Sequence, residues 1–396
     1  MEAGTIAALA PPRVTAAERT AAAPWHLYAA LFGSTSIVIG LIWDISWHTT
    51  IGRDSLWTPA HVAMYLGGVV AGLACGARVL LTTFAGSATE RAASVRFWHF
   101  FYGPLGAWLC IWGTFAMLTS APFDDWWHNA YGLDVKILSP PHSVLALGMI
   151  GVSFGALLIA VALQNRSRDE SESRFRLMYA YAGGVLVVYA AIMASEYLDR
   201  GLMHSSIFYK VACVVFPLFL AGIARASRMR WPATSIAAVY TVITIAMGWI
   251  LPLFPAEPRL GPIYQHVTRM VPMDFPLLLV IPAIGIDWVA RRLSGRRNDW
   301  LLAAALGVTF LVLFAAVQWP FAHFLQSEAS QNWFFYTDNY FYGLSDRSST
   351  VRRVFFDVDA SASARLLGLT VIAPIIAMVS ARAGLWWGAW LRGVRR

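Results

Sequence analysis

The residues of this sequence whose types and spacing could do chemistry form two Asp/His/His triads about eighty residues apart. The triads are Asp44, His48 and His61, and Asp124, His128 and His142. In each triad the Asp and the first His are four residues apart, so both side chains project from the same face of a helix. The second His follows 13 or 14 residues later, after a turn. One carboxylate and two imidazoles suit copper, iron, zinc or manganese, and they also form the facial triad of non-haem iron oxygenases.

The residues around the two triads repeat in register, which indicates a duplicated helical hairpin. The repeated pairs are Trp47/Trp127, Gly52/Gly132, Asp54/Asp134 and Pro59/Pro140. We expect the two Trp side chains to form an apolar collar that limits the access of water. We expect Asp54 and Asp134 to accept an imidazole N–H and so fix the tautomer of a ligand His. Asp125 is an alternative carboxylate for the second triad, although the register favours Asp124.

Polar residues at a hairpin turn can also satisfy one another without a metal ion. The repetition of the whole pattern, with Trp, Gly, Asp and Pro in register, favours the metal sites over that structural interpretation. Four more residues are expected on the same side of the protein, where they could line an entrance or form a further site. They are Glu196, His204, His266 and Asp274. Each of these histidines, taken alone, is more often a surface residue than a ligand.

The composition predicts an all-α, polytopic bundle of transmembrane helices. Hydrophobic residues make up 58% of the 396 residues, charged residues make up 13%, and the mean hydropathy is +0.56. A soluble domain of this size does not need so much apolar surface. About ten stretches are long enough to cross a bilayer as helices. They are residues 25–47, 59–84, 97–120, 141–164, 176–197, 204–224, 233–254, 271–291, 299–322 and 361–382.

The distribution of basic residues predicts the orientation of the bundle. With ten spans, one side receives both termini and the short loops that carry 20 of the 30 Lys and Arg residues. By the positive-inside rule both termini are cytoplasmic, which places both triads at the outer face. The net charge of +8 then reflects topology and contact with membrane lipid. No basic groove with interleaved aromatic residues is present, so nucleic acid is not an expected partner.

The chain is expected to form one membrane domain with five segments. Residues 1–24 form a polar cytoplasmic tail, and residues 25–165 form the duplicated half that carries the triads. Residues 166–322 supply further transmembrane helices. Residues 323–360 form an outer segment rich in aromatic side chains, and residues 361–396 form the last helix and a basic tail.

The spacing of the triads resembles that of a known family. An Asp-x3-His-x12-His triad followed by a second one with x3 and x13 spacing is similar to the C subunit of the copper membrane monooxygenases, the particulate methane and ammonia monooxygenases. The resemblance covers roughly residues 25–165. It implies that Asp44, His48 and His61 are the surer copper site, and that Asp124 stands where the neighbouring triad of the family carries Asn. The family subunit has fewer spans and works with partner subunits, one of which contains a cupredoxin-like domain.

The residues and the resemblance together predict a membrane oxidoreductase of the monooxygenase type. It would use copper, with iron or zinc as alternatives, to oxidise a small apolar or ammonia-like substrate with dioxygen. The expected location is the inner membrane, with the metal sites facing the periplasm or exterior. Other monooxygenase-type subunits or a periplasmic electron donor would be its partners. Two alternatives stay open: a non-catalytic protein for copper or metal handling or assembly, and a structural or transport protein whose polar turns line a vestibule.

Overall fold

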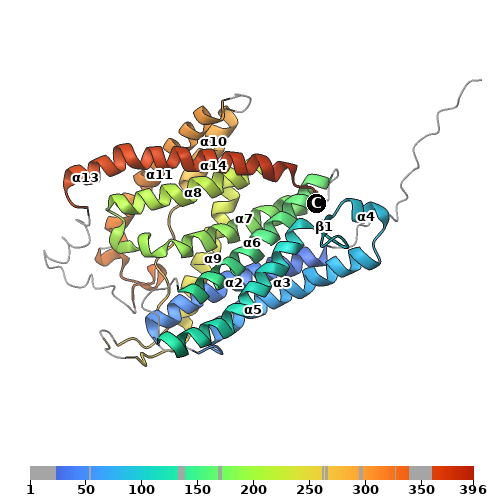
Figure 1. Ribbon diagram of the computed structural model, residues 1–396. Coiled ribbons are helices and arrows are strands. Elements are labelled where there is room, and N and C mark those ends of the chain that lie inside the picture. The colour runs from blue at the N-terminus through green and yellow to red at the C-terminus, as the bar shows by residue number, and fades with distance from the viewer. Residues whose placement is uncertain are drawn as a thin grey trace, which may run out of the picture.

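Long helices packed side by side make up this protein (Figure 1). The computed structural model describes residues 24–52, 55–132, 139–167, 172–260, 263, 266–293, 298–325, 327–338 and 359–396. Within these residues the chain is all-α apart from a small hairpin of β1 (Val95–Phe97) and β2 (Phe101–Gly103), which follows the short helix α4 (Ala88–Ala92). The predicted fold class is therefore confirmed.

Nine helices in the described ranges are long and apolar enough to cross a membrane. They are α2 (Trp25–Thr50), α3 (Pro59–Phe84), α5 (Leu105–Tyr131), α6 (Pro140–Arg166), α7 (Glu172–Met193), α8 (Ser206–Ala226), α9 (Pro232–Ile250), α11 (Asp299–Leu325), and a last helix made of α13 (Ala362–Leu367), a π-helical turn (Gly368–Ile372) and α14 (Ala373–Gly393). The predicted span 97–120 differs at both ends, because the β-hairpin precedes α5 and the helix continues to Tyr131. The last helix likewise continues beyond the predicted residue 382.

The stretch predicted as a helical span over 271–291 is helical only in its second half. Helix α10 (Val280–Arg292) has 13 residues, and the residues from 271 to 278 have no regular secondary structure. Pro272 and Pro276 explain the difference, because proline lacks the N–H that a helix needs and disfavours helical geometry in the residue before it. The N–H groups of Leu277 and Leu278 instead donate to the Tyr240 hydroxyl (3.2 Å) and to Gln318 Oε1 (3.0 Å).

This non-helical stretch and α10 together run from one end of the bundle to the other. The backbone N–H of Val271 donates to Thr50 Oγ1 at the end of α2. The Arg291 guanidinium, near the end of α10, lies 3.4 Å from the centre of the Trp231 ring, beside the start of α9. Backbone that is not helical can lie at membrane depth only where other parts of the protein satisfy it, as Tyr240 and Gln318 do here.

The first and last helices begin and end at the same end of the bundle. Asn165, near the end of α6, donates from Nδ2 to the carbonyls of Leu391 (3.0 Å) and Val394 (2.8 Å). His26, in the first turn of α2, lies close to Arg166 at the end of α6. The nine long helices and the stretch that ends in α10 together therefore make an even number of passes through the bundle. Both triads lie at the opposite end.

Helices α2, α3, α5 and α6 form the part of the bundle that positions the triads. They make two hairpins, α2 with α3 and α5 with α6, and the hairpins pack together through α3 with α5 and α2 with α6. A Cβ atom placed on Gly33 would lie 2.4 Å from the Gly67 carbonyl oxygen, and one placed on Gly113 would lie 2.6 Å from that of Gly148. The two glycine contacts are in register with the triads, so the repeat includes the packing of the helices. Small residues of this kind let membrane helices approach closely.

The remaining predicted segments are described only in part. The first 23 residues, most of the predicted tail, lie outside the described residues, as do residues 339–358 of the predicted outer segment. In the described part of that segment, residues 323–325 complete α11, and two short helical turns follow, η4 (Glu328–Ser330) and η5 (Trp333–Phe335). Tyr336, directly after η5, is buried and packs against Phe275, with ring centres 5.3 Å apart.

Candidate metal centre

The glycine contacts explain why each triad carboxylate points toward a neighbouring helix. Asp44 and Asp124 stand eleven residues after Gly33 and Gly113. Eleven residues are about three helical turns, with only about 20° of rotation left over. Each Asp therefore lies on the same helix face as its glycine, and that face meets the partner helix of the hairpin.

The second His of each triad is positioned by the start of the next helix. His61 and His142 stand in the first turns of α3 and α6, after a proline at the first helical position. The chain reaches these helices through Gly52 and Gly132, whose φ angles of +81° and +84° are in the left-handed region that favours glycine. At the second turn, Ser139 Oγ accepts a hydrogen bond from the backbone N–H of His142 (3.4 Å).

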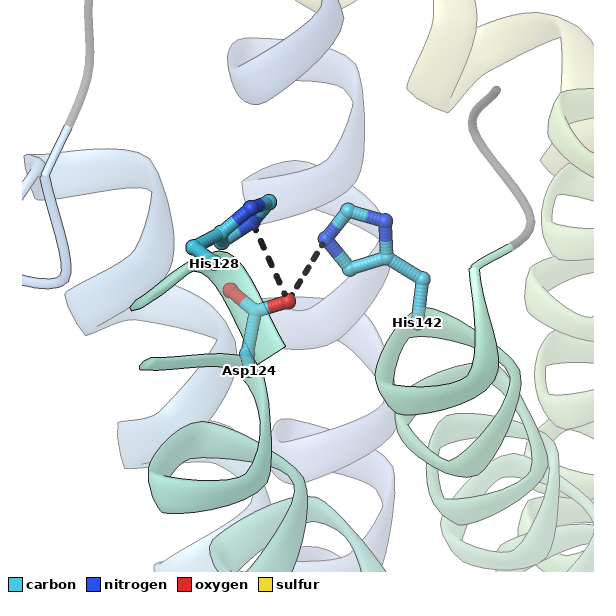
Figure 2. Close-up of side chains that lie close together, drawn as sticks. All are labelled: Asp124, His128 and His142. Carbon is cyan, nitrogen blue, oxygen red and sulfur yellow. Dashed lines mark ion pairs between the residues drawn. The ribbon is translucent and has the colours of Figure 1, made fainter. Parts of the chain in front are cut away.

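In the second triad the three side chains converge on one point (Figure 2). Asp124 Oδ1 lies 3.4 Å from His128 Nε2 and 3.4 Å from His142 Nε2. A tetrahedral ion with bonds of 2.0–2.1 Å holds neighbouring ligand atoms about 3.3 Å apart, so these contacts have the length that such an ion requires. The side chains are between 28% and 37% exposed, so an ion could enter from solvent. No other group of three or more His, Cys, Asp or Glu side chains converges within 4.8 Å among the described residues.

The first triad is assembled by the same elements but is less compact. Asp44 Oδ1 lies 3.0 Å from His61 Nε2, whereas Asp44 Oδ2 lies 3.8 Å from His48 Nε2. The His48 side chain is 49% exposed, while the other two are about one-fifth exposed. The resemblance implies that this first triad is the surer copper site. The distances, however, show that the second triad is the more compact of the two.

Backbone carbonyls set the tautomer of one imidazole in each triad. His61 Nδ1 lies 2.8 Å from the Ser55 carbonyl oxygen, and His128 Nδ1 lies 3.0 Å from that of Gly132. A carbonyl can only accept, so each Nδ1 carries the proton and donates. In a neutral ring, Nε2 then presents its lone pair to the carboxylate of Asp44 or Asp124. Two acceptors facing each other require a proton or a cation between them, and metal-bound histidines are oriented in this way.

The carboxylates predicted to support the triads are placed differently or lie outside the described residues. Asp54 and Asp134, expected to fix the tautomers, belong to the residues that the structure does not describe. Among the described residues, the carbonyls of Ser55 and Gly132 contact one imidazole of each triad. Asp125 is engaged by Asn129, whose Nδ2 donates to the Asp125 carbonyl (2.9 Å) and to its Oδ2 (3.4 Å). Asp124 is thus the carboxylate that meets both histidines, as the register favours.

Aromatic rings surround the end of α5. The Trp127 ring lies 4.5 Å from that of Tyr131 and 6.2 Å from that of Phe123, measured between ring centres. In the first copy, Trp47 packs against the hydrophobic core. The rings of Phe123, Trp127 and Tyr131 thus contact one another along α5, while Trp126 is largely exposed.

The residue that the sequence reasoning missed is Tyr65. It stands four residues after His61, so it lies on the same face of α3, one turn deeper in the bundle. Its hydroxyl lies 3.5 Å from Ser120 Oγ, and Ser120 stands one turn before Asp124 on α5. The spacing from His61 was the available signal. In the second copy Ala146 occupies the equivalent position, so this bridge between the hairpins has no counterpart there.

The four residues expected to form an entrance or a further site do not converge. Asp274 binds Arg200 instead, accepting from its backbone N–H (2.8 Å) and contacting its Nη2 (3.4 Å). His204 is buried and packs against His323, with ring centres 4.2 Å apart. The remaining two, Glu196 and His266, are exposed.

Burial lowers the pKa of one of these groups, His204. The pKa of His204, which lies between η2 (Arg200–Leu202) and α8, is lowered to about 4. Burial of the ring is the main cause, and electrostatic interactions with His323 and Arg365 add to it. A hydrogen bond to the Trp319 carbonyl acts in the opposite direction. His204 is therefore neutral at pH 7.

Comparison of the chain with protein-family models, curated proteins and solved structures returns no match.

Proposed function

We propose that this protein is a membrane metalloprotein that binds transition-metal ions at the two triads and uses them for oxidation chemistry. The observation that carries the proposal is the convergence of Asp124, His128 and His142, with both imidazoles 3.4 Å from one carboxylate oxygen. The repeat of the same residues, turn glycines and helix contacts at Asp44, His48 and His61 supports a second, less compact site.

Copper is the metal that we propose first. Nitrogen and oxygen sites bind Cu²⁺ more tightly than the other divalent first-row ions, and iron and zinc are the alternatives for the same ligand set. One carboxylate bound to a divalent ion gives each site a net charge of +1. Three protein ligands also leave at least one coordination position open, where dioxygen or a substrate can bind.

The proposed activity is that of a monooxygenase-type oxidoreductase at the outer face of the inner membrane. Its orientation rests on the positive-inside rule, since the basic loops lie at the end of the bundle opposite the triads. A small apolar or ammonia-like substrate could approach through the lipid, past the aromatic side chains at the end of α5. Electrons would come from a periplasmic donor or from partner subunits, because each turnover of a monooxygenase consumes two reducing equivalents.

Exposure of the triads favours a second candidate function, which is metal handling. The second triad is about one-third exposed and His48 is half exposed. Ligands that water can reach exchange metal ions readily, which suits a protein that acquires or delivers copper.

The two functions are separated by oxygen uptake and by metal exchange. The protein, purified in detergent without chelator and loaded with copper, is given a reductant and a small apolar or ammonia substrate in an oxygen electrode. An oxidoreductase consumes oxygen with substrate, and His128→Ala loses that uptake while His266→Ala, in an exposed residue that belongs to neither triad, keeps it. Metal that leaves to a chelator within seconds, with no oxygen uptake, supports metal handling instead. If copper, iron and zinc all fail to bind, both functions are excluded.

A further inference from the structure

A cluster of basic residues lies at the end of the four-helix part opposite the triads. His26 stands in the first turn of α2, Arg78 near the end of α3, and Arg166 at the end of α6. The two guanidiniums lie close enough to each other, and to the imidazole, for each to act electrostatically on its neighbours. Three helices thus bring three basic side chains together at one boundary of the membrane.

These groups have few acidic partners. His26 is 8% exposed, and neither its Nδ1 nor Arg78 Nε has a hydrogen-bond partner. Arg78 Nη2 contacts Glu90 at 3.3 Å, near the surface. Arg166 donates from Nε to the Ala162 carbonyl (3.3 Å) and pairs with no carboxylate in the described part of the chain.

In a second basic cluster at the same end, a carboxylate of the chain itself neutralises an arginine. There Arg225 meets both carboxylate oxygens of Asp299, at 3.1 and 3.4 Å, and Arg392 donates to the Arg225 carbonyl. Two adjacent guanidiniums repel each other, and an anion between them relieves that repulsion. In the first cluster the Glu90 carboxylate contacts Arg78 alone, and no carboxylate of the described residues contacts Arg166 or His26.

We propose that His26, Arg78 and Arg166 bind a phosphate group, such as that of an anionic lipid headgroup. Guanidiniums recognise phosphate through paired N–H donors, and basic pockets between membrane helices bind lipid headgroups. The neighbouring surface of α3 suits acyl chains, because Leu80, Leu81 and Phe84 are all at least half exposed. Free phosphate offers the same chemistry without the acyl chains.

Native mass spectrometry of the full chain tests the proposal. The protein is equilibrated with vesicles of phosphatidylcholine containing phosphatidylglycerol, extracted, and scored for retained lipid. We expect about one phosphatidylglycerol per wild-type chain and at least a tenfold loss in the Arg78→Gln/Arg166→Gln protein. Arg230→Gln, in an exposed arginine at the same end, should retain lipid like the wild type. If the double variant fails to fold, lipid retention is measured instead in Arg78→Gln, Arg166→Gln and Arg166→Lys.

The second arm of the experiment distinguishes the source of the phosphate. Without lipid retention, inorganic phosphate should still raise the melting temperature of the wild type and not that of the double variant. The proposal is overturned if neither probe binds, or if the double variant binds both as the wild type does. Metal content is measured in parallel, so failure here is independent of the triads.

Discussion

The contact between Gly113 and Gly148 should be sensitive to a single added methyl group. In Gly113→Ala the new Cβ would lie 2.6 Å from the Gly148 carbonyl oxygen and 2.7 Å from the Val152 nitrogen. Ordinary contact begins near 3.4 Å, so α5 and α6 must separate by about 0.8 Å, the difference between the two values. The opposing atoms are backbone and cannot rotate away. Overpacking of this kind costs about 1–3 kcal/mol.

The separation should also weaken the second triad. Asp124 is on α5 and His142 is on α6, the two helices that would separate. The 3.4 Å distance between Asp124 Oδ1 and His142 Nε2 would then grow to about 4.2 Å, beyond the roughly 3.3 Å between neighbouring ligand atoms of a tetrahedral ion. We expect metal affinity at this triad to fall at least tenfold. Gly33→Ala should have the same effect on the first triad and spare the second.

Gly76→Ala is the matched control, because no atom lies within 4 Å of a Cβ at that position. It should be neutral or stabilise α3 by up to about 1 kcal/mol, since alanine favours helix more than glycine does. Stability is measured by thermal unfolding in detergent and affinity by calorimetric metal titration. If Gly113→Ala is as stable as Gly76→Ala and binds metal equally well, the packing argument is wrong.

Further predictions concern groups away from the triads. His204, with its pKa lowered from 6.5 to about 4, resists protonation in the folded state, so the free energy of unfolding should decrease between pH 6.5 and 4 by up to about 3 kcal/mol. Unfolding measured across that range should show a flatter profile for His204→Asn, and an unchanged profile would contradict the assignment. Asp287 is buried and accepts from the backbone N–H groups of Ala233 and Thr234, so Asp287→Ala should cost about 1–3 kcal/mol in thermal unfolding. Asp299→Asn, which breaks a partly exposed pair with Arg225, should cost less than about 1 kcal/mol by the same assay. A larger loss from Asp299→Asn than from Asp287→Ala would reverse the expected order.

Hydropathy was sufficient to predict the helices but not the interruption of one of them. Nine of the predicted spans correspond to long apolar helices, because a membrane span needs only a sustained apolar run. Over 271–291 the run is equally apolar, yet Pro272 and Pro276 leave N–H groups that Tyr240 and Gln318 must satisfy. Those partners come from distant helices, which a local pattern cannot identify.

The triads could be predicted because their spacing is a local property of helix and turn. The Asp-His pairs are four residues apart, and the turn glycines return the chain, so Asp124, His128 and His142 meet as the pattern indicates. The unequal geometry of the two triads was not visible in the sequence, since it depends on where each helix end packs. The Tyr65 to Ser120 contact depends on the packing of one hairpin against the other.

Metal content per chain decides whether the triads are metal sites. The wild-type protein and the His48→Ala and His128→Ala variants are purified without chelator, loaded with copper or iron, and analysed by elemental mass spectrometry. We predict two equivalents per wild-type chain, with one lost in each variant, and the His128 site should bind more tightly. Wild-type protein that holds no metal after loading, or variants that hold as much as the wild type, would contradict the proposal.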